Sequence, residues 1–191
     1  MQSVKKNVLV LATLQALLFT NNSTVIALNG LAGYALAPNK SLATLPVTGW
    51  VVGAALTTFF ASLLMKRIGR RGGFTVGTLC GMLGATVCCV ALYTKHFPLF
   101  VAGASIFGVY NAFGQYYRFA AADAAPVDFR AKAISYVLAG GLVGGIIGPS
   151  LSRWTKDLLP TEFLGAYLTL IGFLAVVLVV LRFLDIPRPT E

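Results

Sequence analysis

The residues in this sequence that could recognise a ligand are side-chain amides placed inside apolar segments. Gln15, Asn22 and Asn29 stand seven residues apart within the apolar stretch 8–31. A helix has about 3.6 residues per turn, so residues seven apart fall on one stripe of its surface. Amides donate and accept hydrogen bonds without carrying charge. The stripe is therefore suited to a polar neutral or amphipathic small molecule.

A second polar stripe follows the same geometry in the stretch 99–122. Asn111, Gln115 and Arg118 stand at positions i, i+4 and i+7, and Tyr110 begins a neighbouring stripe. An unpartnered polar group facing lipid is costly, so both stripes must face protein or water. Two interpretations stay open: the stripes line a polar cavity, or they bond neighbouring helices together at roughly 0.6 to 2 kcal/mol per bond.

Arg118 differs from the amides because it lies near the end of its apolar segment. Its side chain could extend to the lipid headgroups, pair with Asp123, or contact a substrate, in which case a weak anion would also suit the site. No Asp or Glu lies deep in any apolar segment, and acid–base catalysis needs convergent titratable groups. We therefore expect neither an enzyme nor a cofactor.

The cysteines do not form a metal site or a disulfide framework. Cys80, Cys88 and Cys89 lie in one apolar segment without C-x-x-C spacing, and the only histidine, His96, lies beyond it. A copper site would also want Met, Cys or His facing a cavity. We interpret the cysteines as small packing residues and predict no metal.

Membrane-spanning helices must position these side chains. Of the 191 residues 57% are hydrophobic and 11% are charged, with a mean hydropathy of +0.80, whereas a soluble domain has about 25% charged residues. Crossing a bilayer takes about 20 mostly apolar residues. The sequence predicts a single all-α domain over 1–191 whose six spans cover about 8–31, 45–65, 74–94, 99–122, 133–152 and 164–184.

The basic residues predict the orientation of these spans. The net charge of +9 comes from short basic runs between apolar segments, which is typical of cytoplasmic loops and not of a nucleic-acid-binding surface. With both ends inside, ten basic residues face the inside and four face the outside. The ten are Lys5, Lys6, Lys66, Arg67, Arg70, Arg71, Arg130, Lys132, Arg182 and Arg188, and the four are Lys40, Lys95, Arg153 and Lys156.

Two stretches hint at an internal repeat. The stretch 53–66, GAALTTFFASLLMK, superimposes on 140–153, GGLVGGIIGPSLSR, after a shift of 87 residues. A shift of 90 residues sets Asn21 on Asn111. Two units with an odd number of spans must be inverted relative to each other, which predicts the three-plus-three inverted repeat found in transporters.

The loop LLMKRIGRRGGF, residues 63–74, is a tight basic turn suited to anionic lipid headgroups. It also resembles the loop signature of the major facilitator superfamily, Gly-x-x-x-Asp-Arg-x-Gly-Arg-Arg. The matching residues are Arg67, Gly69, Arg70 and Arg71. Ser62 and Lys66 depart from the signature, and Lys66 replaces the acid that helps latch the two halves of such transporters.

Two further stretches resemble the same family. Gly140, Gly144 and Gly148 lie four apart and predict close helix packing, with Pro149 adding a bend; Gly144, Gly148 and Pro149 match a Gly-x-x-x-Gly-Pro signature. Packing and a hinge are compatible readings of this helix. The loop before this helix also resembles a loop of the family, and the matching residues are Asp123, Pro126 and Arg130.

The resemblance covers the whole chain and only the N-terminal half of a usual twelve-span member. The family often has an arginine early in its fourth helix, whereas here Arg118 comes late, in a stretch similar to a bacterial branch that includes copper importers. The resemblance implies that helices one and four line a central cavity. It implies a multi-pass protein, in the bacterial inner membrane, that carries a small molecule by alternating access together with a second six-helix bundle.

That second bundle could be a separate polypeptide, a second copy of this chain, or a part missing from it. The alternatives are a half-transporter that serves as an assembly or regulatory partner without transporting, and a truncated fragment.

Overall fold

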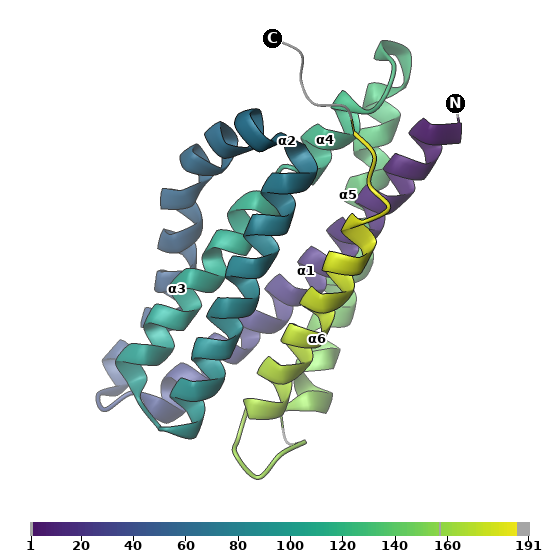
Figure 1. Cartoon of the computed structure of the whole chain (residues 1–191). Helices are drawn as coiled ribbons and strands as arrows, with labels where there is room; N and C mark the ends of the chain where they lie inside the picture. The colour runs from purple at the N-terminus through teal and green to yellow at the C-terminus, as the bar shows by residue number, and fades with distance from the viewer. Residues whose placement is uncertain (1, 157, 187–191) are drawn as a thin grey trace.

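The computed structural model describes residues 2–156 and 158–186, and this part of the chain is helical with no β-strand (Figure 1). Five helical stretches within it are long and apolar enough to span a membrane. The elements are α1 (Gln2–Leu36), η1 (Lys40–Leu42), α2 (Leu45–Tyr93), α3 (Phe97–Gly114), α4 (Tyr117–Asp123), η2 (Val127–Phe129), α5 (Arg130–Thr155) and α6 (Leu164–Leu181).

Helix α2 is too long for one crossing of a bilayer. Its 49 residues would extend roughly 73 Å at 1.5 Å per residue, against about 30 Å of hydrocarbon. Gly69 leaves helical geometry, with φ 82° and ψ 165°, and splits α2 into two arms that turn back at the bend, with α3 packed against both (Figure 1). The loop expected over 66–73 is therefore helical except at this glycine, because the helix continues into the basic residues from both sides.

The span expected over 99–122 lies within one stretch that could cross a membrane, Phe97–Asp123, and this stretch has an irregular turn between two helices. Helix α3 ends at Gly114 and α4 begins at Tyr117. The Tyr116 N–H donates to the Phe113 carbonyl at 3.1 Å, so the last turn tightens into 3-10 geometry. Gly114 favours this break because glycine is a weak helix former, and it also lets Leu18 of α1 approach closely.

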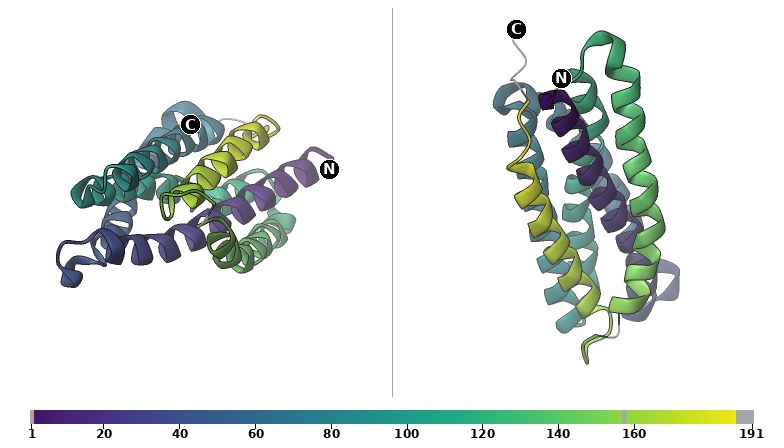
Figure 2. Two further views of the ribbon diagram at one scale, coloured as in Figure 1. Left: turned by 90° about the horizontal axis from the view of Figure 1, so that it is seen from below. Right: turned by 90° about the vertical axis from the view of Figure 1, so that its right-hand side faces the viewer.

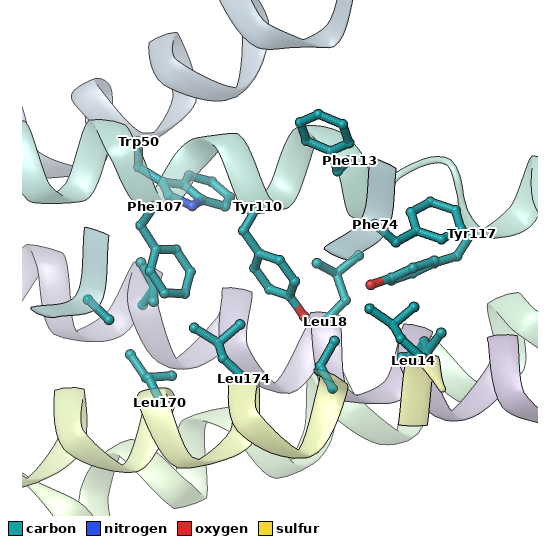
Figure 3. Close-up of a cluster of buried hydrophobic side chains, with 14 of the residues drawn as sticks. Leu14, Leu18, Trp50, Phe74, Phe107, Tyr110, Phe113, Tyr117, Leu170 and Leu174 are labelled. Atoms are coloured by element: carbon teal, nitrogen blue, oxygen red, sulfur yellow. The ribbon is translucent and has the colours of Figure 1, made fainter. Parts of the chain in front are cut away.

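An aromatic core holds the helices together (Figure 3). Phe74 of α2 packs on Tyr117 of α4 with ring centroids 4.6 Å apart. Leucines of α1 and α6 complete this core, which includes Leu14, Leu18, Trp50, Phe74, Phe107, Tyr110, Phe113, Tyr117, Leu170 and Leu174. In the most apolar part of the stretch Val127–Thr155, which contains α5, only 22% is buried, the lowest share among the five stretches. Of the five stretches, the one that contains α5 is therefore the least covered by the rest of the bundle.

The start of α1 and the end of α6 lie at the same end of the bundle (Figures 1 and 2). The bend at Gly69 and the connection between α4 and α5 lie at this end too. Asn7 ties the two segments together, because its amide donates to the Asp185 carbonyl at 2.6 Å and its side-chain oxygen accepts from the Asp185 N–H at 3.2 Å.

Candidate functional site

Three amide side chains converge where α1 meets α3. Asn22 Nδ2 donates a hydrogen bond to Asn111 Oδ1 at 2.8 Å, and Gln115 Nε2 donates to the same oxygen at 3.0 Å. We call Asn22, Asn111 and Gln115 the amide cluster. The two polar stripes thus meet at one point, with Asn111 as their common acceptor.

The amide cluster keeps unused hydrogen-bonding groups at the edge of the bundle. Asn22 is 7% exposed and its Oδ1 is buried without a partner, whereas Asn111 and Gln115 are only partly buried. Within the described residues, Asn111 Nδ2 and Gln115 Oε1 also have no hydrogen-bond partner. The Asn111 NH2 group and Gln115 Oε1 are therefore left as one donor and one acceptor for a ligand or for another part of the protein, whereas Asn22 Oδ1 is enclosed by the bundle.

Gln15 lies on the same helix but faces α5. It is 2% exposed, and a Cβ on Gly141 would lie 3.3 Å from its Cγ. Its Oε1 is buried without a partner. No hydrogen bond joins it to the amide cluster among the described residues, so the cluster does not extend along the whole stripe.

Asn29 ties three helices together instead of lining a cavity. The Tyr167 hydroxyl of α6 donates to Asn29 Oδ1 at 2.5 Å, and Asn29 Nδ2 donates to the Pro46 carbonyl of α2 at 3.5 Å. Asn29 is fully buried, and both ends of its amide are used inside the protein. The geometry at this position matches the interhelical-bonding interpretation of the stripe.

Tyr110 lies inside the bundle close to Asn21, which was not among the predicted site residues. The Tyr110 hydroxyl is buried without a hydrogen-bond partner, and so are both amide atoms of Asn21, which is 0% exposed. Figure 3 shows the hydroxyls of Tyr110 and Tyr117 pointing toward one another beside Leu18. The internal repeat could have identified Asn21 as a candidate site residue, because a shift of 90 residues superimposes it on the predicted site residue Asn111.

Arg118 does not join the amide cluster. Its side chain is exposed, and the guanidinium lies over the ring of Phe119, 5.0 Å from the centroid. The pairing with Asp123 does not form, because Asp123 binds Arg70. Of the three roles considered for Arg118, the pairing with Asp123 is not formed among the described residues, whereas contact with lipid headgroups and contact with a substrate stay predictions.

The basic turn after the first arm of α2 is anchored by Arg70. Its Nε and Nη2 donate to Asp123 Oδ2 at 3.0 and 2.8 Å, which ties the Gly69 bend to the end of α4. Arg67 and Arg71 are exposed on either side of the bend. Arg130 opens α5 and its Nε donates to the Ala125 carbonyl at 3.4 Å.

The glycines of α5 lie against the backbone of α1. A Cβ on Gly140 would lie 2.4 Å from the Ala12 carbonyl oxygen, and one on Gly144 would lie 2.0 Å from that of Ala16. At Gly148 the contact includes a hydrogen bond, in which the Thr24 hydroxyl donates to the Gly148 carbonyl at 3.0 Å. Pro149 follows inside the helix. Each of these glycines therefore allows a helix contact that a side chain would block.

Metal ligands do not gather in the described part of the chain. It holds no group of three or more His, Cys, Asp or Glu side chains that could bind an ion. The three cysteines are free, and the Cys88 thiol donates to the Phe100 carbonyl at 3.8 Å.

The apolar helical bundle with buried amides is that of an integral, multi-pass membrane protein. The sequence profile of the Major Facilitator Superfamily matches residues 10–191, and the chain belongs to this family of membrane transporters. The superfamily comprises transporters and not enzymes, in agreement with the expectation from the sequence.

Two curated bacterial transporters are similar to this chain. The riboflavin transporter RfnT of Brucella anthropi is 39% identical over 184 residues, covering 94% of this chain and 46% of RfnT. The uncharacterised MFS-type transporter YdeG of Bacillus subtilis is 29% identical over 133 residues, which cover 69% of this chain and 31% of YdeG. The chain thus spans less than half the length of each of these curated relatives.

The crystal structure of the E. coli fucose:proton symporter FucP has the same fold. It superimposes with a TM-score of 0.74 at 14% identity, covering 94% of this chain and 49% of FucP.

Proposed function

We propose that this chain is one six-helix half of a transporter that moves a small solute across the bacterial inner membrane by alternating access. The bend at Gly69 supports six crossings, because each arm of α2 is long enough for one span. An even number of crossings agrees with α1 starting and α6 ending at the same end of the bundle. The excess of basic residues at that end supports its assignment to the cytoplasm.

The six spans form two inverted three-helix units in this proposal. The first unit is α1 with the two arms of α2, and the second is α3–α4 with α5 and α6. Asn22 lies on the first helix of one unit and Asn111 on the first helix of the other, so their hydrogen bond joins equivalent helices. Inverted units that meet at a polar midpoint are a transporter arrangement.

A second bundle completes the pathway. Helix α5 leaves a large apolar surface uncovered, including Leu142, Ile146 and Trp154, and the amide cluster is only partly covered. A single bundle offers one wall of a pathway, whereas two bundles can rock about a site between them. The chain's match to about half of RfnT and of FucP supports the same division. The second bundle is either another half or a second copy of this chain.

We propose that the solute is a flavin such as riboflavin. The flavin ring carries an imide edge with one N–H and two carbonyl groups, and it is uncharged. Asn111 Nδ2 can donate to one carbonyl of such an edge, and Gln115 Oε1 can accept from its N–H. RfnT, which is named as a riboflavin transporter, is 39% identical to this chain. The unused groups of the amide cluster are the observation that carries the proposal.

The other predicted residues take supporting roles in this proposal. Gln15 and Tyr110 extend the polar region on either side of the amide cluster. The α5 glycines and Pro149 let α5 rock against α1, while Arg70 and Asp123 hold the cytoplasmic bend. Arg118 reaches the headgroup region, and Asn29 serves packing. The similarity of the stretch around Arg118 to the copper-importer branch stays a prediction.

The test is uptake of radiolabelled riboflavin into proteoliposomes. We propose to join this chain to the part of RfnT outside the match, which supplies a second bundle. Saturable uptake by the fusion supports the proposal, whereas uptake by a strictly monomeric 191-residue chain would exclude the requirement for two bundles. A fusion that folds, with no uptake, would contradict the assignment of riboflavin.

The rival function is an assembly or regulatory module without transport activity. The double variant Asn22→Leu and Asn111→Leu separates the two in the same fusion. Loss of uptake at unchanged expression supports a transport site. Unchanged uptake with lower expression would show that the polar stripes are purely structural and would favour the rival function.

A further inference from the structure

A groove between the second arm of α2 and α6 lies on the outside of the bundle, away from the amide cluster. Its volume is about 270 Å³, and it is lined by Arg71, Thr75, Leu79, Leu178, Leu181 and Arg182. The proposed transport function does not involve this groove. Two helices far apart in sequence therefore bring two arginines to one cavity.

The guanidinium groups of Arg71 and Arg182 have no partner in the described part of the chain. Both side chains are exposed, and no acidic residue there forms an ion pair with either of them. The other conspicuous arginine of this region, Arg70, is by contrast neutralised by Asp123. Two uncompensated positive charges beside one groove favour a negatively charged occupant.

The lining changes from charged to apolar along the groove. Arg71, Thr75 and Leu79 are spaced four residues apart on one wall, and Leu178 and Arg182 have the same spacing on the other. The charged ends lie toward the Gly69 bend and the end of α6, where the bundle meets the headgroup layer in the proposed orientation. Leu178 lies about one turn deeper than Arg182, and Leu79 lies about two turns deeper than Arg71, at the depth of the acyl chains.

We infer that this groove binds an anionic phospholipid, with its phosphate between Arg71 and Arg182 and an acyl chain along Leu79 and Leu178. Arginine binds phosphate oxygens through paired N–H donors, and basic pockets between membrane helices favour anionic headgroups. A soluble anion would leave the leucine walls unused. The inference rests on the groove and on the cytoplasmic orientation, and not on the identity of the transported solute.

The test is native mass spectrometry of the full chain in detergent, titrated with phosphatidylglycerol or phosphatidylcholine. We expect phosphatidylglycerol to bind more tightly. The variant Arg71→Gln with Arg182→Gln should weaken it about fivefold per arginine and about thirtyfold in total, from the charge–lipid interaction of a basic residue near the surface. Arg71→Lys with Arg182→Lys keeps both charges but loses the paired N–H donors, so it should weaken binding less than the glutamine variant does.

The matched control is Lys5→Gln with Lys6→Gln, which removes the same charge from the same end of the bundle. It should leave the affinity nearly unchanged. An equal loss in the control would show diffuse attraction and would overturn the site, as would equal binding of the two lipids by the wild type. Binding of glycerol phosphate as tight as that of phosphatidylglycerol would also overturn it, because the leucine walls would then contribute nothing.

Discussion

The side-chain amide of Asn22 in α1 lies 2.8 Å from the side-chain oxygen of Asn111 in α3 and donates a hydrogen bond to it. Gln115, one turn further along, donates to the same oxygen at 3.0 Å. Both hydrogen-bonding positions of Asn111 Oδ1 are therefore occupied, and the Asn111 NH2 group is left free to donate. In the proposed function, solute binding by the amide cluster depends on this arrangement.

Replacing Asn111 with leucine should abolish most transport by the fusion. The substitution removes the free donor and the common acceptor at once, while its apolar side chain fits a partly buried position. Loss of hydrogen bonds to a bound solute should lower uptake at limiting riboflavin roughly tenfold or more. The melting temperature in detergent should fall modestly, because Asn22 Nδ2 and Gln115 Nε2 lose their acceptor, so uptake is compared at equal amounts of folded protein. Equal uptake by variant and wild type would remove Asn111 from the site.

Replacing Tyr167 with phenylalanine should lower stability and leave substrate affinity unchanged. The change removes the hydroxyl that donates to Asn29 and leaves Asn29 Oδ1 buried without a partner. Such a loss costs about 1–3 kcal/mol. Unfolding in a denaturing detergent series measures it, alongside the riboflavin KM of the fusion. A raised KM at unchanged stability would place Asn29 in the solute pathway after all.

Replacing Gly144 with alanine should separate α5 from α1. The new Cβ would lie 2.0 Å from the Ala16 carbonyl oxygen, a distance that forces the helices apart. Overpacking of this kind costs about 1–3 kcal/mol. The matched control is Gly145→Ala, because nothing lies within 4 Å of a Cβ there. Equal melting temperatures for the two variants would argue against close packing of these helices.

Replacing Gly69 with alanine should destabilise the bend in α2. Gly69 has φ 82° and ψ 165°, a region that is populated almost only by glycine. An alanine held there costs about 1–3 kcal/mol. Gly172→Ala in α6 is the control, since its Cβ meets nothing within 4 Å. Thermal unfolding should separate the two variants, and a neutral Gly69→Ala would mean that the arms are not joined by this conformation.

The pair formed by Arg70 and Asp123 should contribute modestly to stability. Their side chains are 19% and 47% exposed, so solvent screens the attraction. A double-mutant cycle with Arg70→Gln and Asp123→Asn should give a coupling of about 0.5–1 kcal/mol that shrinks at high salt. A coupling near zero at low salt would show that the bend is held by packing alone.

The sequence was sufficient to predict the helical bundle, its family and the polar stripes. Runs of about 20 apolar residues leave few alternatives to membrane helices. Helical spacing also predicted that Asn22 and Asn111 belong to stripes that face protein or water, and the structure places the two side chains together. Periodicity within each segment carried this information because it depends on local geometry alone.

The contacts between helices could not be predicted from the sequence. Asn29 shares a stripe with Asn22, yet its side-chain oxygen accepts a hydrogen bond from Tyr167, which lies 138 positions later in the sequence. Asp123 was considered as a partner of Arg118, five residues away, whereas the fold brings Arg70 to it. The break after Gly114 and the unpaired Asn21 likewise depend on neighbours from other helices. Such choices are decided by three-dimensional packing, which local spacing does not encode.

The most direct test of the account is the initial rate of radiolabelled riboflavin uptake into proteoliposomes that contain the fusion of this chain with the unmatched part of RfnT. The account predicts saturable uptake that excess unlabelled riboflavin suppresses and that Asn111→Leu lowers roughly tenfold or more. Uptake that is absent from the folded fusion, or that is unchanged by Asn111→Leu, would contradict it.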